Sequence, residues 1–230
     1  MISKCVHFQR QARAARWLML ATVVFVSVAA NVRAADSETR DFTVRVDGKP
    51  AGNAAMSIQR QDDGTTIVAC DTTVKVRVLI KTYAYTCQTR ETWKDGRLQQ
   101  LNSSCNDDGK QFQVSAVSQA DGIHVRVNGR EHIAKPEAWV SSYWTLPDAK
   151  LREGVVAVID ADNGRDLQGR LQFIGEAQIA VAGQVQNVQH YRFNGPTRID
   201  LYYDAAQRLV RQEWVEDGHP TALELARVRR

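Results

Sequence analysis

The sequence predicts an all-β protein, an antiparallel meander of about ten or more strands that forms a strongly curved sheet or barrel. Apolar and polar residues alternate over most of the chain, nine Asp-Gly or Asn-Gly dipeptides separate the alternating runs, and a single stretch near 136–146 departs from this rhythm. Alternation buries one face of a strand and leaves the other in water. Asp-Gly and Asn-Gly suit the positive φ angles of tight hairpin turns.

The first expected element is a secretion signal at residues 1–34. Basic residues precede an apolar run from Trp17 to Ala30, and Val32-Arg33-Ala34 fits a cleavage site after Ala34. This run is shorter than the ~20 residues of a spanning helix, although an uncleaved anchor is the alternative. We expect residues 35–230 to form a single β domain in the periplasm or outside the cell, with no membrane span in the mature chain.

The leader also accounts for the basic character of the full chain. It carries five of the 30 basic residues and none of the 26 acidic ones, which leaves the mature chain with a net charge of −1. The basic pI therefore does not indicate nucleic-acid binding. The basic tail Arg227–Arg230 is interpreted as solvated charge.

Alternation is clearest in three stretches, at residues 74–80, 123–127 and 198–203. In each, Val, Ile, Leu or Tyr occupies every second position. A sheet of this many strands must curl, split or close, because exposed edges pair with other chains. We therefore expect a strongly curved sheet or a barrel.

The stretch near 136–146 is expected to be a short helix or an ordered loop laid against the sheet. Trp139 and Tyr143, and Val140 and Trp144, have the i,i+4 spacing of a helix face. Pro136 suits the first turn of a helix, and Pro147 would end it.

The sequence IDADNGRD at 159–166 resembles a calcium loop but does not fit one. Counted from Asp160, Gly164 falls at position five and Leu171 at position twelve, where an EF-hand needs glycine at six and glutamate at twelve. Asp160, Asp162 and Asp166 could bind a cation only weakly. We predict instead a hairpin centred on Asn163-Gly164, with arms at 155–162 and 165–174.

Three cysteines remain after the leader, and an oxidising compartment favours one disulfide and one free thiol. A two-residue turn at Asp95-Gly96 pairs position 87 with 104, so a single β-bulge would bring Cys87 and Cys105 face to face. We favour the Cys87–Cys105 pair, with Cys70–Cys87 as the alternative. The chain has no Cys-x-x-Cys motif, so a redox thiol is the weaker interpretation.

No catalytic or metal-binding signature stands out. His124, His132 and His190 lack zinc-site spacing, and neither a Gly-x-Ser-x-Gly elbow nor a phosphate-binding loop is present. We predict no metal and no cofactor. Carboxylates such as Glu91, Glu213 and Glu224 are expected at the surface by default, although a pair of them could act as acid and base.

Aromatic residues are the most suggestive feature, with fourteen after Ala34. Each buries ~150–250 Å² when covered, so they fill the concave side of the sheet or line a pocket. The first of these interpretations is favoured. Under the second, the 139–144 segment covers an apolar cavity of at least ~300 Å³. The candidate ligand-binding residues are Tyr83, Trp93, Trp139, Tyr143, Trp144, Tyr191, Tyr203 and Trp214.

The succession of motifs resembles an uncharacterised family of exported bacterial β-proteins, known only as a domain of unknown function. The motifs span nearly all of the mature chain and lie at residues 42–52, 91–98, 106–110, 142–144, 190–195 and 200–204. The resemblance implies no catalytic residues. Tyr202 stands where the family pattern has tryptophan, and the three cysteines are particular to this chain. The architecture is also similar, more loosely, to that of periplasmic lipoprotein carriers, whose curved sheet and helical lid hold acyl chains, but a fold does not fix a function.

These observations favour an exported, non-enzymatic binding or carrier module for an apolar or amphiphilic ligand, such as a hydrophobic small molecule or lipid. The alternative is an envelope scaffold that binds a protein partner, which would expose an apolar patch above ~400 Å². An uncharacterised hydrolase-like enzyme ranks third.

Overall fold

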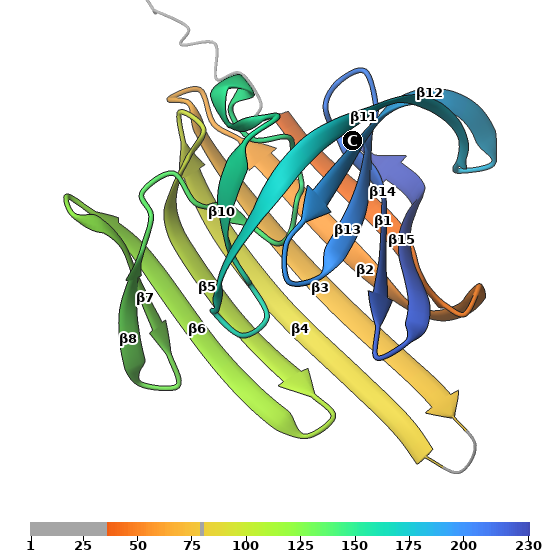
Figure 1. The fold of residues 1–230 in the computed structure, drawn as a ribbon, viewed down its shortest axis with the longest axis horizontal. Helices are drawn as coiled ribbons and strands as arrows, with labels where there is room; N and C mark the ends of the chain where they lie inside the picture. Colours follow the sequence, from red (N-terminus) through yellow and green to blue (C-terminus); the bar gives the residue numbers. More distant parts are fainter. Residues whose placement is uncertain (1–35, 79–80) are drawn as a thin grey trace, which may run out of the picture. The chain divides into compact units, whose positions relative to one another are not determined.

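The computed structural model describes residues 36–78 and 81–230, so the expected leader lies outside the described residues. The described chain forms one 15-stranded sheet and a single 3₁₀ turn at Ala149–Leu151 (Figure 1). The strands are β1 Asp36–Val46, β2 Lys49–Arg60, β3 Thr65–Val78, β4 Lys81–Lys94, β5 Arg97–Asp107, β6 Lys110–Gln119, β7 Gly122–Val127, β8 Arg130–Ala134, β9 Trp139–Val140, β10 Val155–Ile159, β11 Asp166–Val181, β12 Gln184–Asn194, β13 Arg198–Tyr203, β14 Leu209–Glu216 and β15 His219–Arg229.

The sheet is a meander folded back on itself. Its strand order is β8-β7-β6-β5-β4-β3-β2-β1-β15-β14-β13-β12-β11-β10-β9, so the first and last strands of the described chain pair in the middle. All neighbours are antiparallel except β9 and β10, which run parallel. The sheet is curved and not closed, with β8 and β9 at its two edges. The predicted fold class is confirmed.

Turn chemistry explains the meander. All nine Asp-Gly and Asn-Gly dipeptides fall at junctions between consecutive strands. At five of these junctions both residues have positive φ, for example 51° at Asp95 and 76° at Gly96. This is the geometry of two-residue hairpins, because their twist matches that of the flanking strands.

Alternation buries the expected faces. Ile123 and Val125 are buried while Arg126 is exposed, and Leu201 and Tyr203 are fully covered. Asp200 is also buried on the other face of β13, because its carboxylate accepts hydrogen bonds from His190 and Arg192 at 2.6 and 2.8 Å.

The stretch 136–146 is an ordered loop and not a helix. Trp139 and Val140 form β9, which pairs with Val158 and Ile159 of β10. Tyr143 has φ of +46°, a left-handed conformation that ends any right-handed helix. The residues with i,i+4 spacing are nevertheless all buried, as that spacing suggested: Trp139 with Tyr143, and Val140 with Trp144.

The loop at Asn163-Gly164 is longer than predicted. β10 ends at Ile159 and β11 begins at Asp166, so six residues connect the strands. Asp160 explains the difference, because its carboxylate accepts hydrogen bonds from the backbone N–H of Asp162 and the side chain of Asn163 at 3.0 and 2.8 Å.

Within the described part of the chain, we find no helix with the length and hydropathy needed to cross a membrane.

Candidate functional site

The structure brings six of the eight candidate aromatic residues into one buried core. They are Trp93, Trp139, Tyr143, Trp144, Tyr191 and Tyr203. Tyr83 instead lies at the surface, where its hydroxyl donates to Asp107 at 2.8 Å. Trp214 is half-buried beside the core, with its indole N–H directed to Glu216 at 3.1 Å.

The 139–144 segment packs tightly into this core. The Trp139 and Tyr143 rings lie 4.7 Å apart edge to face, and the Trp144 ring lies 6.2 Å from that of Trp93. Neither of the two hollows described below lies beneath the segment. The expectation of an open apolar cavity there is therefore not supported, because the aromatic rings pack on one another.

Backbone contacts hold the segment in place. The Arg40 guanidinium donates to the Trp144 carbonyl at 2.8 Å, and the Tyr203 hydroxyl donates to the Tyr143 carbonyl at 3.0 Å. The backbone N–H of Ser141 donates to Ile159 at 3.0 Å. These anchors retain a bulky residue, Tyr143, in the left-handed region, which costs on the order of 1–3 kcal/mol and is found most often where structure serves function.

Glu91, expected at the surface, is completely buried on β4. Its Oε2 accepts a hydrogen bond from the Trp93 indole at 2.7 Å, whereas Oε1 has no partner and no described cation pairs with the carboxyl group. Burial raises its pKa to about 7, against the lowering effect of the neighbouring Ser142 and Trp93. The signal was present in the sequence: Glu91 is in phase with Cys87 and Trp93, so it occupies the inward face of its strand.

Other buried polar atoms also lack hydrogen-bond partners. In the described chain, eight buried side-chain N or O atoms have no hydrogen-bond partner, and six belong to β4 or to the 139–144 segment: those of Thr89, Glu91, Trp139, Ser142, Tyr143 and Trp144. Buried polar groups are nearly always hydrogen-bonded, and each exception calls for an explanation. We call Thr89, Glu91, Trp93, Ser142 and Trp144 the Glu91 site.

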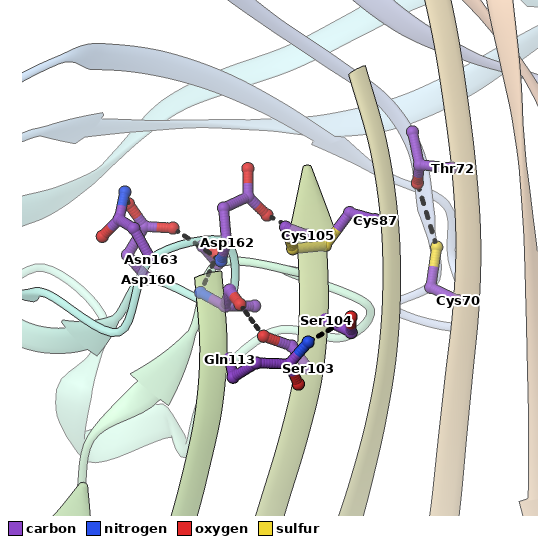
Figure 2. The surroundings of a disulfide bond; sticks show 12 residues. Cys70, Thr72, Cys87, Ser103, Ser104, Cys105, Gln113, Asp160, Asp162 and Asn163 are labelled. Atoms are coloured by element: carbon purple, nitrogen blue, oxygen red, sulfur yellow. Dashed lines mark hydrogen bonds between the residues drawn. A yellow bond between two sulfur atoms is a disulfide. The ribbon is translucent and has the colours of Figure 1, made fainter. Parts of the chain in front are cut away.

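A second, partly buried acidic group lies beside the disulfide (Figure 2). Asp162 Oδ1 is 3.8 Å from Cys87 Sγ, and the nearby Ser103 hydroxyl donates to the Ala161 carbonyl at 2.5 Å. Burial, followed by the charge of Asp160, raises the pKa of Asp162 to about 7. Burial also raises the pKa of Asp160. These carboxyl groups pack within the 160–165 loop.

The predicted disulfide is confirmed. Cys87 and Cys105 are joined, their Cα atoms lie 4.0 Å apart, and they are direct cross-strand partners. As predicted, one bulge sets the register, since Trp93 pairs with Leu98 and Thr92 with Gln100. Cys70 is the free thiol, on β3, and burial raises its pKa to about 11.

Among the described residues, one cluster has metal-ligand spacing: Cys87, Cys105 and Asp162. Its two sulfur atoms are bonded to each other, so they are not available as thiolate ligands. The three candidate histidines lie apart, each against one aspartate: His124 with Asp121, His132 with Asp166 and His190 with Asp200.

The structure has two adjoining hollows over the outward faces of β3–β7. Their volumes are about 440 and 390 Å³, and both are lined mainly by amide and hydroxyl side chains. Gln88, Ser104 and Gln113 line both. Nothing in the sequence marked these residues, because polar positions on outward faces look like ordinary solvated surface.

The fold defines an uncharacterised class of barrel-like all-β proteins, here with a carboxyl group buried beneath an ordered segment. The chain belongs to the family described as a domain of unknown function (DUF6134), whose model matches residues 42–226. This confirms the resemblance inferred from its motifs. Comparison with curated proteins found no match.

Among solved structures, the chain is similar to a beta-barrel-like protein of domain of unknown function DUF1849 from Brucella abortus. The TM-score is 0.60 at 12% identity, over 85% of this chain and 98% of that chain. At this identity the similarity shows the fold alone.

Proposed function

We propose that this protein is an exported, non-enzymatic binding protein of the cell envelope, and that it holds the polar head of an amphiphilic molecule at the Glu91 site. The observation that carries the proposal is the buried, uncompensated carboxyl of Glu91 among unpartnered donors and acceptors. Burying polar groups without partners costs on the order of 1–3 kcal/mol each. A ligand that supplies the missing hydrogen bonds would recover that energy.

The unpartnered atoms define the chemistry of the head group. The Ser142 hydroxyl can donate or accept a hydrogen bond, and Glu91 Oε1 donates one while the carboxyl group is protonated and accepts one when it is ionised. The Trp144 indole can only donate. A head that both donates and accepts, such as an alcohol or an amide, satisfies these atoms. The surrounding aromatic rings favour an apolar body behind that head.

Entry of such a ligand requires the 139–144 segment to move outward. The segment forms only a two-residue strand, β9, at the sheet edge, and its other anchors include the backbone hydrogen bond from Ser141 to Ile159 and the side chains of Arg40 and Tyr203. The left-handed Tyr143 would regain a relaxed conformation when the segment opens.

Tryptophan fluorescence tests the proposal, since Trp93 and Trp144 belong to the site. We expect monolauroylglycerol, whose head donates and accepts hydrogen bonds, to change the emission with saturation. Dodecylphosphocholine, whose head donates none, is expected to bind at least tenfold more weakly. Glu91→Leu should weaken monolauroylglycerol binding at least tenfold, and Glu176→Leu, on an exposed position of β11, should leave it unchanged. Equal binding by both variants would refute the assignment.

Export is tested separately. We expect the protein recovered from the periplasmic fraction of expressing cells to begin at Ala35 by N-terminal sequencing. Recovery from the cytosol with Met1 retained would contradict export and leave the Glu91 site untouched.

A further inference from the structure

We infer that the outward face of β3–β7 is a second binding site, and that it takes an anionic glycan, a polyhydroxylated chain that carries carboxylate groups. This site lies on the opposite side of the sheet from the Glu91 site and does not depend on it. Side chains alternate between the two faces of a strand, so Gln88 and Arg90 point outward where Cys87 and Glu91 point inward.

The first observation is a row of polar side chains shared by the two hollows. Strand register aligns four outward residues across β3, β4, β5 and β6: Asp71, Gln88, Ser104 and Gln113. Hydrogen bonds already orient the two amides, because Gln88 donates to Asp71 at 2.8 Å and Gln113 donates to Ser104 at 2.7 Å. Both glutamine residues are exposed.

A second row runs parallel to the first, two residues along each strand. It contains only neutral side chains, and its members are Thr73, Thr86, Asn106 and Gln111. All four are exposed. Rows two residues apart are about 7 Å from each other and strands about 4.8 Å, which is the scale of a sugar ring and its hydroxyl groups.

The third row, on the other side of the first, supplies positive charge. It aligns Arg90, Asn102, Ser115 and Arg126 across β4 to β7, and all four line the larger hollow. Arg126 is paired with Glu131, whereas Arg90 forms no ion pair with a described residue. An exposed guanidinium beside amides and hydroxyls matches a carboxylate carried on a hydroxyl-rich chain.

These observations favour a glycan over an apolar ligand or nucleic acid. Nine of the twelve aligned side chains are neutral hydrogen-bonding groups, and aromatic stacking platforms are missing from both linings. Single-stranded nucleic acids are held by stacking on such platforms together with a strongly basic groove. Neutral amides and hydroxyls suit sugar hydroxyl groups, with Arg90 selecting an acidic unit.

Isothermal titration calorimetry with tetragalacturonate tests this site. We expect saturable binding, weakened at least tenfold by Arg90→Gln and at least fivefold by Gln88→Ala. The matched controls are Arg97→Gln, an exposed cation at the start of β5, and Gln100→Ala, an outward residue of β5 that lies outside both hollows. Both controls should bind within twofold of the wild type.

Two further probes give the results that would overturn the inference. Cellotetraose, a neutral chain of equal length, should bind at least tenfold more weakly than tetragalacturonate, and hexaglutamate should not bind at this face. Equal binding of hexaglutamate would show a site for polyanions or peptides. Absence of tetragalacturonate binding at millimolar concentration, or equal binding of cellotetraose, would also refute an anionic-glycan site.

Discussion

At the scale of single residues, the protein is distinguished by where it places its carboxyl groups. Glu91 is fully buried with one hydrogen bond from Trp93 and no cation, and Asp162 lies against the disulfide. A buried carboxyl without a cation resists ionisation. Burial therefore raises the pKa of Glu91 to about 7, and burial together with the charge of Asp160 raises the pKa of Asp162.

This placement makes stability depend on pH. The pKa of Glu91 is 4.5 when solvated and about 7 in the folded protein, so the folded state binds the proton more tightly. The stability that comes from the protonated Glu91 is fully present below pH 4.5 and is lost as the pH rises through about 7. Between pH 5 and pH 8, ionisation of Glu91 should lower the free energy of unfolding of the wild type by up to about 3 kcal/mol. Glu91→Gln has no ionisable group at this position and should not show this loss.

Urea unfolding at pH 5 and pH 8 measures the difference. Glu176→Gln, on an exposed position, serves as the control. Its free energy of unfolding should depend on pH in the same way as that of the wild type. Asp162 contributes its own pH dependence in all three proteins, so the comparison isolates Glu91. Identical pH dependence in Glu91→Gln and the wild type would show that Glu91 ionises normally.

At the scale of elements, the β4–β5 hairpin was predicted in detail, whereas for the 139–144 segment the sequence left a short helix and an ordered loop open, and the structure has the loop. Turn residues and alternation are local signals. The Asp95-Gly96 turn therefore sets the register of the two strands, and pairing Cys87 with Cys105 in that register requires a bulge. The segment follows a helical spacing, yet Trp139 and Val140 pair with β10. Pairing with β10, about twenty residues away, overrides the local periodicity. The sequence of the segment alone does not indicate this pairing.

The disulfide should stabilise this hairpin measurably. It closes a loop with a sequence separation of 18, for which constraint of the unfolded chain predicts about 3 kcal/mol. The double variant Cys87→Ala/Cys105→Ala should lose that amount in urea unfolding. Cys70→Ala, which removes a thiol and no bridge, is the control, and a loss no greater than that of the control would contradict the prediction.

At the scale of the whole sheet, contacts between distant strands were beyond sequence-based prediction. β1 pairs with β15, and the 160–165 loop reaches strands β6 and β7. His132 of the edge strand β8 lies 3.2 Å from Asp166 of β11. Alternation shows that a face is buried but not which strands cover it.

The packing of the 160–165 loop can be tested at Gly164. A Cβ atom there would lie 2.3 Å from Val127 Cγ2, and the residue has φ of +73°. Gly183 has a similar φ of +79° but open space around it. Gly164→Ala should therefore destabilise the protein by about 1–3 kcal/mol more than Gly183→Ala in thermal unfolding. Equal losses would mean that the loop does not pack on β7.

Native mass spectrometry of the protein purified gently from the periplasm tests the central claim most directly. The account predicts a bound species of a few hundred daltons that is released on denaturation, extracts into organic solvent and is depleted in Glu91→Leu. A wild-type protein that remains free of any bound molecule through repeated gentle preparations would contradict it.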